Sequence, residues 1–128
     1  MRKFRAALGL LAGIVMVLSS AAHSLLGWKQ FQAALEELQA PSDLIFGLAV
    51  GWHFGGVAIF TFGCIAIVVF ASVLRGRAVS LLPTALIAIA YMVFGIGALA
   101  MSKNPFFFIF IVPGLMLAFA SLPARAAA

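Results

Sequence analysis

Four long apolar runs constrain the fold of this chain more than any other feature. They cover residues 6–26, 44–74, 78–102 and 105–122, and none of them contains an Asp, Glu, Lys or Arg. A helix needs roughly 20 predominantly apolar residues to cross about 30 Å of hydrocarbon. Each run meets or approaches that length, so the sequence predicts an all-α integral membrane protein with four transmembrane helices in a bundle.

The composition excludes an ordinary soluble domain. The chain of 128 residues is 66% hydrophobic and only 9% charged, whereas soluble domains carry roughly 25% charged residues. Four spans and short loops use almost the whole length, so we expect residues 1–128 to form a single transmembrane domain. The net charge of +5 comes from basic residues that flank the spans, which indicates a lipid bilayer and not a nucleic acid as the partner.

The basic residues are divided unequally between the two predicted sides of the membrane. Six lie on one side: Arg2, Lys3, Arg5, Arg75, Arg77 and Arg125. The other side carries Lys29 and Lys103 together with all three acids, Glu36, Glu37 and Asp43. The positive-inside rule then predicts a bacterial inner-membrane protein with both the N- and the C-terminus in the cytoplasm.

The first apolar run also resembles a secretory signal. A basic start precedes an apolar core, and the small residues Ser20, Ala21 and Ala22 resemble a cleavage site. Cleavage would leave three spans. We expect the run to be kept as the first transmembrane helix.

Two further segments carry helix patterns. In residues 28–40, apolar side chains recur at helical spacing among Lys, Gln and Glu, which predicts a short amphipathic interfacial helix between the first and second spans. In the second span, Gly47, Gly51 and Gly55 recur every four residues. Such a face of small residues usually packs backbone against backbone in lipid, so we expect a helix contact there.

The candidate site consists of two histidines. The spans contain four titratable side chains, His23, His53, Cys64 and Tyr91, and no carboxylate. By helical rise, both histidines lie in the outer half of the bilayer. We therefore expect His23 and His53 to face one outward-facing cavity, and a titratable residue inside a membrane is a candidate for function. The neighbouring polar and aromatic residues predicted to line this ligand pocket are Ser20, Ser24, Trp28 and Trp52.

Several chemistries fit such a pair. The histidines could serve as structural hydrogen-bonding groups, as axial ligands of a haem, or as part of a pocket for a quinone or another lipophilic ligand. Two histidines without a third ligand make an incomplete metal site, so no metal is expected. We expect Phe106, Phe107, Phe108 and Phe110 to face lipid or to fill packing space, and Cys64 to act as a small buried hydrophobe.

Two function classes follow. The first is a non-enzymatic packing or accessory subunit of a homo-oligomer or a larger membrane complex, supported by the glycine face. The second is a binder of a haem, quinone or other lipophilic ligand near His23 and His53. The sequence contains no Walker loop, dinucleotide fingerprint or HExxH motif, and no carboxylate within the spans. An enzyme is the less favoured expectation.

Reporter fusions test the predicted topology. A reporter fused after Arg77 or after Ala128 should signal the cytoplasm, because the basic residues concentrate on that side. A fusion after Lys103 should signal the opposite side and is the matched control. An external signal from either of the first two fusions would contradict the four-span orientation.

Overall fold

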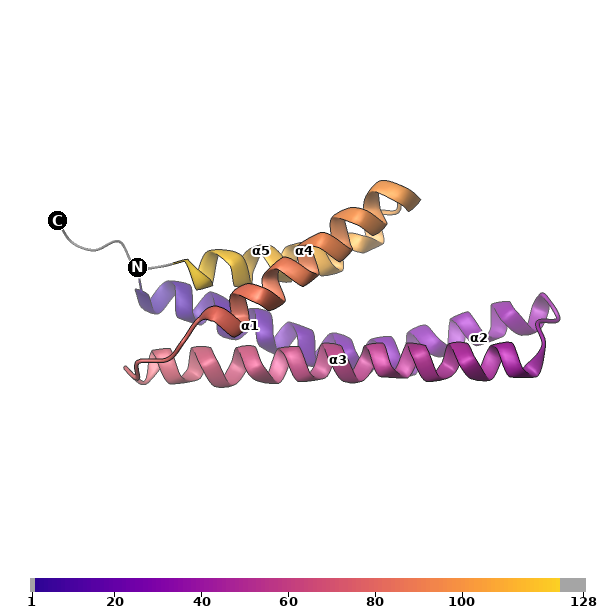
Figure 1. The fold of residues 1–128 in the computed structure, drawn as a ribbon, viewed down its shortest axis with the longest axis horizontal. Helices are drawn as coiled ribbons and strands as arrows, with labels where there is room; N and C mark the ends of the chain where they lie inside the picture. The colour runs from indigo at the N-terminus through magenta and orange to yellow at the C-terminus, as the bar shows by residue number, and fades with distance from the viewer. Residues whose placement is uncertain (1, 123–128) are drawn as a thin grey trace.

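The computed structural model describes residues 2–122, and Arg125, which enters the topology argument, lies outside them. Every regular element in this described range is helical (Figure 1). The elements are α1 (Arg2–Ala21), the π-helix η1 (Ala22–Gly27), α2 (Trp28–Glu37), α3 (Ser42–Leu74), α4 (Leu82–Ser102), the 3₁₀ turn η2 (Pro105–Phe107) and α5 (Phe108–Ser121).

The first three elements form one continuous helix. Ala21, Gly27 and Trp28 all keep right-handed helical dihedrals, and the apolar helix extends over Lys3–Glu37. A helix over the predicted amphipathic segment is confirmed, but it continues the first long helix directly and is not a separate element. The π-helix is a local bulge that does not end the helix. The first backbone with positive φ is at Gln39.

Small residues bring α1 and α3 into close antiparallel contact. A Cβ added to Gly13 would lie 2.9 Å from the carbonyl oxygen of Gly63, and one added to Gly63 would lie 2.9 Å from that of Gly13. Further along, Gly56 of α3 packs against the Ser24 side chain, and Gly9 of α1 packs against the ring of Phe70. The two backbones therefore approach as closely as small residues permit in a bundle.

The contact face of α3 is not the glycine face predicted from sequence. The residues that meet the first long helix are Trp52, Gly56, Gly63 and Phe70, with separations of four, seven and seven residues. This spacing keeps one face turned toward a partner helix over many turns. A Cβ added to Gly47 or Gly51 would meet nothing within 4 Å, and one at Gly55 would reach only His23 Nε2, at 3.5 Å. The predicted face is thus not the packing seam within the chain.

A second, shorter hairpin covers part of the first. It consists of α4, η2 and α5, and α5 packs against α1. The turn between its helices places Lys103 in the left-handed region, and the Asn104 side chain accepts a hydrogen bond of 2.9 Å from the backbone N–H of Phe106. Helical structure therefore begins at Pro105, where the fourth apolar run begins.

Polar contacts tie the two hairpins together at the end near the N-terminus, which we call the closed end. Arg5 donates hydrogen bonds to the carbonyl oxygens of Phe119, at 3.1 Å, and Ala120, at 3.4 Å. These two hydrogen bonds reach carbonyl groups in the last turn of α5, where partners within the helix run out. Within the short hairpin, the hydroxyls of Thr84 and Ser121 lie 2.8 Å apart and join α4 to α5 at the same end.

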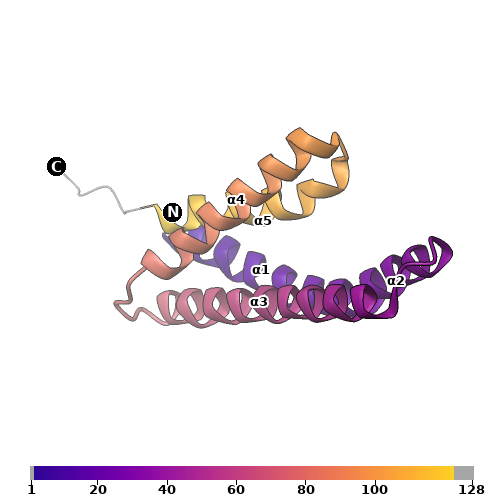
Figure 2. The ribbon, with the colours of Figure 1, turned by 45° about the vertical axis from the view of Figure 1, so that its right-hand side comes forward.

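At the other end, which we call the open end, the short hairpin leans away from the long one. Figures 1 and 2 both show α4 diverging from α3 toward the turn at Lys103. Contacts between α3 and α4 are accordingly sparse, whereas α4 packs along α5. The space needed for a cavity arises from this divergence.

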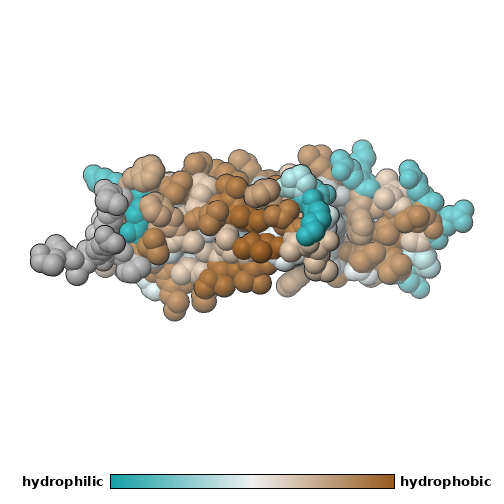
Figure 3. All heavy atoms as spheres, turned by 90° about the horizontal axis from the view of Figure 1, so that it is seen from above, coloured by the Kyte–Doolittle hydropathy of each residue, from teal (hydrophilic) through white to brown (hydrophobic). Residues whose placement is uncertain are grey.

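Three of the helices are long and apolar enough to cross a membrane: Lys3–Glu37, Ser42–Leu74 and Leu82–Ser102. The fourth apolar run, Pro105–Ser121, is helical but shorter. With 33 residues, α3 is about 50 Å long at 1.5 Å per residue, longer than the hydrocarbon layer is thick. In Figure 3, hydrophobic side chains cover the middle of the visible face and hydrophilic ones gather toward its ends, as expected for a protein that lies in lipid.

Candidate functional site

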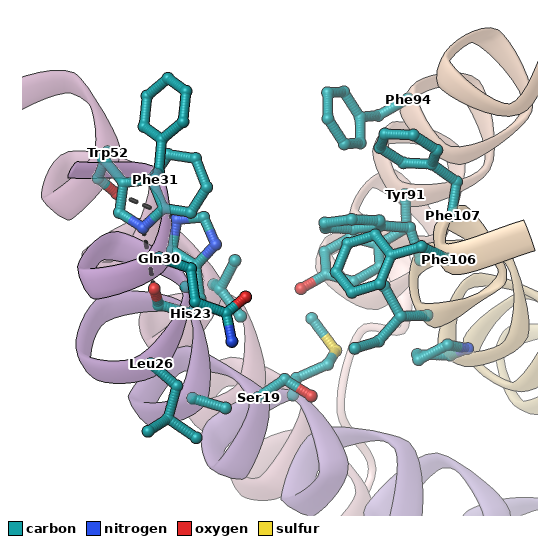
Figure 4. A pocket seen from close by; sticks show the side chains of 17 residues that line it. Ser19, His23, Leu26, Gln30, Phe31, Trp52, Tyr91, Phe94, Phe106 and Phe107 are labelled. Atoms are coloured by element: carbon teal, nitrogen blue, oxygen red, sulfur yellow. Dashed lines mark hydrogen bonds between the residues drawn. The ribbon is translucent and has the colours of Figure 1, made fainter. Parts of the chain in front are cut away.

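A hollow lies between the two hairpins at the open end (Figure 4). It has a volume of about 680 Å³ and receives side chains from α1, η1, α2, α3, α4, η2 and α5. Small-molecule sites typically enclose roughly 300–1,000 Å³. The hollow therefore has the size of a ligand-binding cavity.

Aromatic side chains contribute to both of its opposing walls. The wall on the long hairpin carries Phe31 and Trp52, whose rings stack 5.1 Å apart at 22°. The wall on the short hairpin carries Tyr91, Phe94, Phe106, Phe107 and Phe110. None of the described residues that line the cavity is an Asp, Glu, Lys or Arg. Such a lining suits a neutral molecule with a large apolar part.

His23 and Trp52 hold the first wall together by a reciprocal contact. The indole N–H of Trp52 donates to the backbone carbonyl of His23, at 2.8 Å. In return, Nε2 of His23 lies 3.1 Å from the backbone carbonyl of Trp52. The two rings stack with their centroids 4.5 Å apart and 2° from parallel. Each residue thus fixes both the backbone and the ring of the other across the contact between η1 and α3.

The π-helix places the His23 carbonyl in this contact. The backbone N–H of Trp28 bonds to the carbonyl of His23, five residues earlier, where a regular α-helix would use the residue four earlier. The same oxygen also accepts the indole N–H of Trp52. π-Bulges occur often at functional sites, and here the bulge lies beside the cavity.

The contact also fixes which ring nitrogen of His23 carries the proton. A backbone carbonyl can only accept a hydrogen bond, so Nε2 of His23 must donate to the backbone carbonyl oxygen of Trp52. In the neutral ring, the proton on Nε2 leaves Nδ1 as an acceptor. Since His23 lines the cavity, that acceptor is the polar group that the histidine offers to a bound molecule.

Tyr91 is the most unusual polar group of the site. The residue is only 6% exposed, and its hydroxyl oxygen has no hydrogen-bond partner among the described residues. Figure 4 shows the hydroxyl directed into the cavity, toward the wall that carries His23 and Gln30. Leaving a buried hydroxyl unpaired costs about 1–3 kcal/mol. A bound molecule with a matching polar group would recover that cost.

Of the predicted site residues, only His23 and Trp52 line the cavity. The Ser20 hydroxyl donates to the Val17 carbonyl at 2.7 Å. The Ser24 side chain packs against Gly56. Trp28 and His53 contact each other, with ring centroids 5.7 Å apart, but neither lines the cavity.

The expectation that both histidines share one cavity is therefore wrong. His53 is exposed and does not line the space beside His23. The reason is geometric, because consecutive residues of a helix point about 100° apart. Trp52 occupies the direction toward His23, so His53 points elsewhere.

The residues present do not fit a haem held by two histidines. Such a site needs a ring nitrogen from each histidine in one space. Nε2 of His23 is engaged by the carbonyl of Trp52, and His53 lies outside the cavity. Within the described residues, no group of three or more His, Cys, Asp or Glu side chains could hold a metal ion.

Two kinds of lining residue were missed from the sequence. Phe106, Phe107 and Phe110 were expected to face lipid or fill space, but they form the second wall. Tyr91 was recognised as titratable and was not assigned to the pocket. Its position as the only hydroxyl-bearing aromatic of an apolar run was the available signal.

Comparisons with models of protein families, with curated proteins and with solved structures give no match for this chain. No relative therefore suggests a ligand or a partner. The features that bear on function are the aromatic cavity, the contact between His23 and Trp52, and the unpaired hydroxyl of Tyr91.

The contact between His23 and Trp52 can be tested by Trp52→Phe. This change keeps an aromatic ring but removes the N–H that bonds to the His23 carbonyl. We expect the free energy of unfolding in detergent to fall by about 1–2 kcal/mol, the value of one part-buried hydrogen bond with some packing loss. Trp28→Phe is the matched control, because the Trp28 indole makes no hydrogen bond within the described residues. Equal losses in both variants would contradict a specific role for the Trp52 N–H.

Proposed function

We propose that this chain is a small integral membrane protein that binds a neutral, lipophilic molecule in the cavity between its two hairpins. The observation that carries the proposal is the buried hydroxyl of Tyr91, which has no partner within residues 2–122 and points into an aromatic cavity (Figure 4). Cavities that bind small molecules combine a mainly apolar lining with a few well-placed polar groups. The cavity offers this combination through Tyr91, His23, Gln30 and Ser19.

The surroundings of the cavity support delivery of the ligand from the bilayer. The helices α3 and α4 diverge toward the open end (Figure 2). Their exposed side chains include Phe54 and Val57 of α3, and Phe94 of α4, which also lines the cavity. A lipophilic molecule could pass between these helices without first entering water. This route explains why an apolar cavity is useful in a protein with little polar surface.

The proposal includes the finer topology. We infer four spanning helices, counting Pro105–Ser121 as the fourth, in a bacterial inner membrane with both termini in the cytoplasm. The distribution of Lys and Arg supports this orientation. The cavity would then lie in the outer half of the bilayer, on the side of Lys29 and Lys103.

A matched pair of alanine substitutions tests the proposed function. Ala22 lines the cavity and is exposed to it, so Ala22→Phe should fill part of the binding space without disturbing the core. Ala33 is also exposed, on α2, and does not line the cavity. Wild type and Ala33→Phe should retain a neutral lipid through purification, detected by solvent extraction and mass spectrometry. In Ala22→Phe we expect the bound amount to fall by about tenfold, since added bulk competes with the ligand.

The comparison of Ala22→Phe with Ala33→Phe can also contradict the proposed function. Equal lipid contents in the two variants, or no retained neutral lipid in wild type, would contradict a ligand-binding cavity. The unfolding temperature of both variants should match that of wild type, which separates loss of ligand from loss of fold.

A second candidate function is that of a packing subunit in a homo-oligomer or a larger membrane complex. One observation favours it: Gly47 and Gly51 lie on α3 with nothing near enough to touch an added Cβ. These positions leave a strip of small residues open to another helix, and small residues promote close helix association in lipid.

Two glycine variants of α3 distinguish the roles of its faces. Gly63→Leu should lower the unfolding temperature by several degrees, because the new side chain would meet Val17 and the Gly13 carbonyl. Gly51→Leu should leave the unfolding of the monomer unchanged but abolish any oligomer detected by cross-linking in native membranes. If Gly51→Leu leaves cross-linking unchanged, the open strip does not carry an oligomer contact.

A further inference from the structure

We propose that the molecule bound in the cavity presents a hydroquinone-type ring, and that the site prefers this reduced, hydroxyl-bearing form over the matching quinone. This inference rests on the proposed function, because it specifies the chemistry of the ligand at the same cavity. Two features carry it: the aromatic walls, and the pairing of the Tyr91 hydroxyl, which can donate or accept a hydrogen bond, with the fixed acceptor of His23.

The walls favour a flat ring. Phe31 and Trp52 stack at 22° on one side of the cavity, and Phe107 and Phe110 lie at 26° to each other on the opposite side. Aromatic pairs gain about 0.5–1.5 kcal/mol beyond the burial of their area. The cavity of about 680 Å³ has room for a single ring and the first part of an apolar tail. A ring seated between the walls would contact aromatic faces from both hairpins.

The polar groups of the two walls differ in what they can do. The Tyr91 hydroxyl can donate or accept a hydrogen bond, and it has no partner among the described residues. In the neutral His23 ring, Nδ1 can only accept, because the proton resides on Nε2 and is donated to the Trp52 carbonyl. Moving that proton to Nδ1 would leave the Trp52 carbonyl without this donor. The contact between His23 and Trp52 therefore holds the acceptor in place.

This fixed acceptor discriminates between the two redox forms of a ring. A hydroquinone hydroxyl can donate to Nδ1 of His23, and the other hydroxyl oxygen can accept from Tyr91. A quinone carbonyl oxygen at the same place would face Nδ1 of His23. Both atoms can only accept a hydrogen bond, so both would be left without a donor. Gln30 also lines the cavity, and its amide can donate or accept a hydrogen bond, so it does not favour either form.

Direct binding measurements test the inference. The protein is reconstituted in phosphatidylcholine nanodiscs and titrated anaerobically with 2-decyl-1,4-benzohydroquinone and, separately, with 2-decyl-1,4-benzoquinone. The heats of binding from these titrations are corrected by subtracting those of titrations into empty nanodiscs, because both probes partition into lipid. We expect the hydroquinone to bind about tenfold more tightly, the effect of one matched instead of one mismatched buried hydrogen bond.

Three variants assign the preference to named groups. His23→Gln retains an amide N–H near the position of Nε2 but lacks the Nδ1 acceptor. The hydroquinone and the benzoquinone should then bind with about equal affinity. Tyr91→Phe should weaken both probes by about tenfold, because the hydroxyl contacts either form. His53→Gln is the matched control, since His53 belongs to the neighbouring aromatic contacts but not to the cavity, and it should leave both affinities unchanged.

Wild type alone can overturn the inference, so the test does not depend on the folding of any variant. Equal affinity for the two probes, or tighter binding of the benzoquinone, would overturn it. If neither probe binds while wild type still retains a neutral lipid that Ala22→Phe loses, the hydroquinone assignment fails and the proposed function stands. If neither probe binds and no lipid is retained, both fail.

Discussion

The close contact between the backbones at Gly13 and Gly63 is the constraint on which the rest of the structure depends. A Cβ on either residue would lie within 3 Å of the opposite backbone, so only glycine allows the two long helices to approach this far. Because α1 and α3 are this close, His23 and Trp52 can reach each other's carbonyl groups further along. The first wall of the cavity is therefore a consequence of helix packing some distance from it.

The second wall depends on where the short hairpin is fastened. Arg5 of α1 holds it at the closed end through hydrogen bonds to two carbonyl groups of α5, and no comparable polar contact between the hairpins is found at the open end of the described chain. The short hairpin can therefore diverge there, and the aromatic residues of α4, η2 and α5 face the wall of His23 and Trp52 across a gap. Firm attachment at one end and divergence at the other create a cavity without weakening the core.

Buried polar groups distinguish this cavity from a simple packing defect. Dry cavities in proteins are usually lined by apolar atoms alone. Here a buried tyrosine hydroxyl has no partner among the described residues, while the histidine of the opposite wall has one nitrogen engaged and one left for the cavity. The combination gives the site a defined set of donors and acceptors, which is the property that lets a binding site select between related lipophilic molecules.

The amino-acid pattern alone predicted the helical class and the positions of the apolar helices, and it marked His23 and Trp52 as candidate site residues. These predictions follow from local properties: hydrophobic length and the cost of polar groups in an apolar run. Which face of α3 packs against the first long helix depended instead on contacts between helices. The face that packs carries Trp52, Gly56, Gly63 and Phe70, and it is not the face that carries Gly47, Gly51 and Gly55. The partner helix sets the rotation of α3 about its own axis. That rotation turned Trp52 toward His23, turned His53 away, and left Tyr91 to complete the site from a helix that no local pattern connects to it.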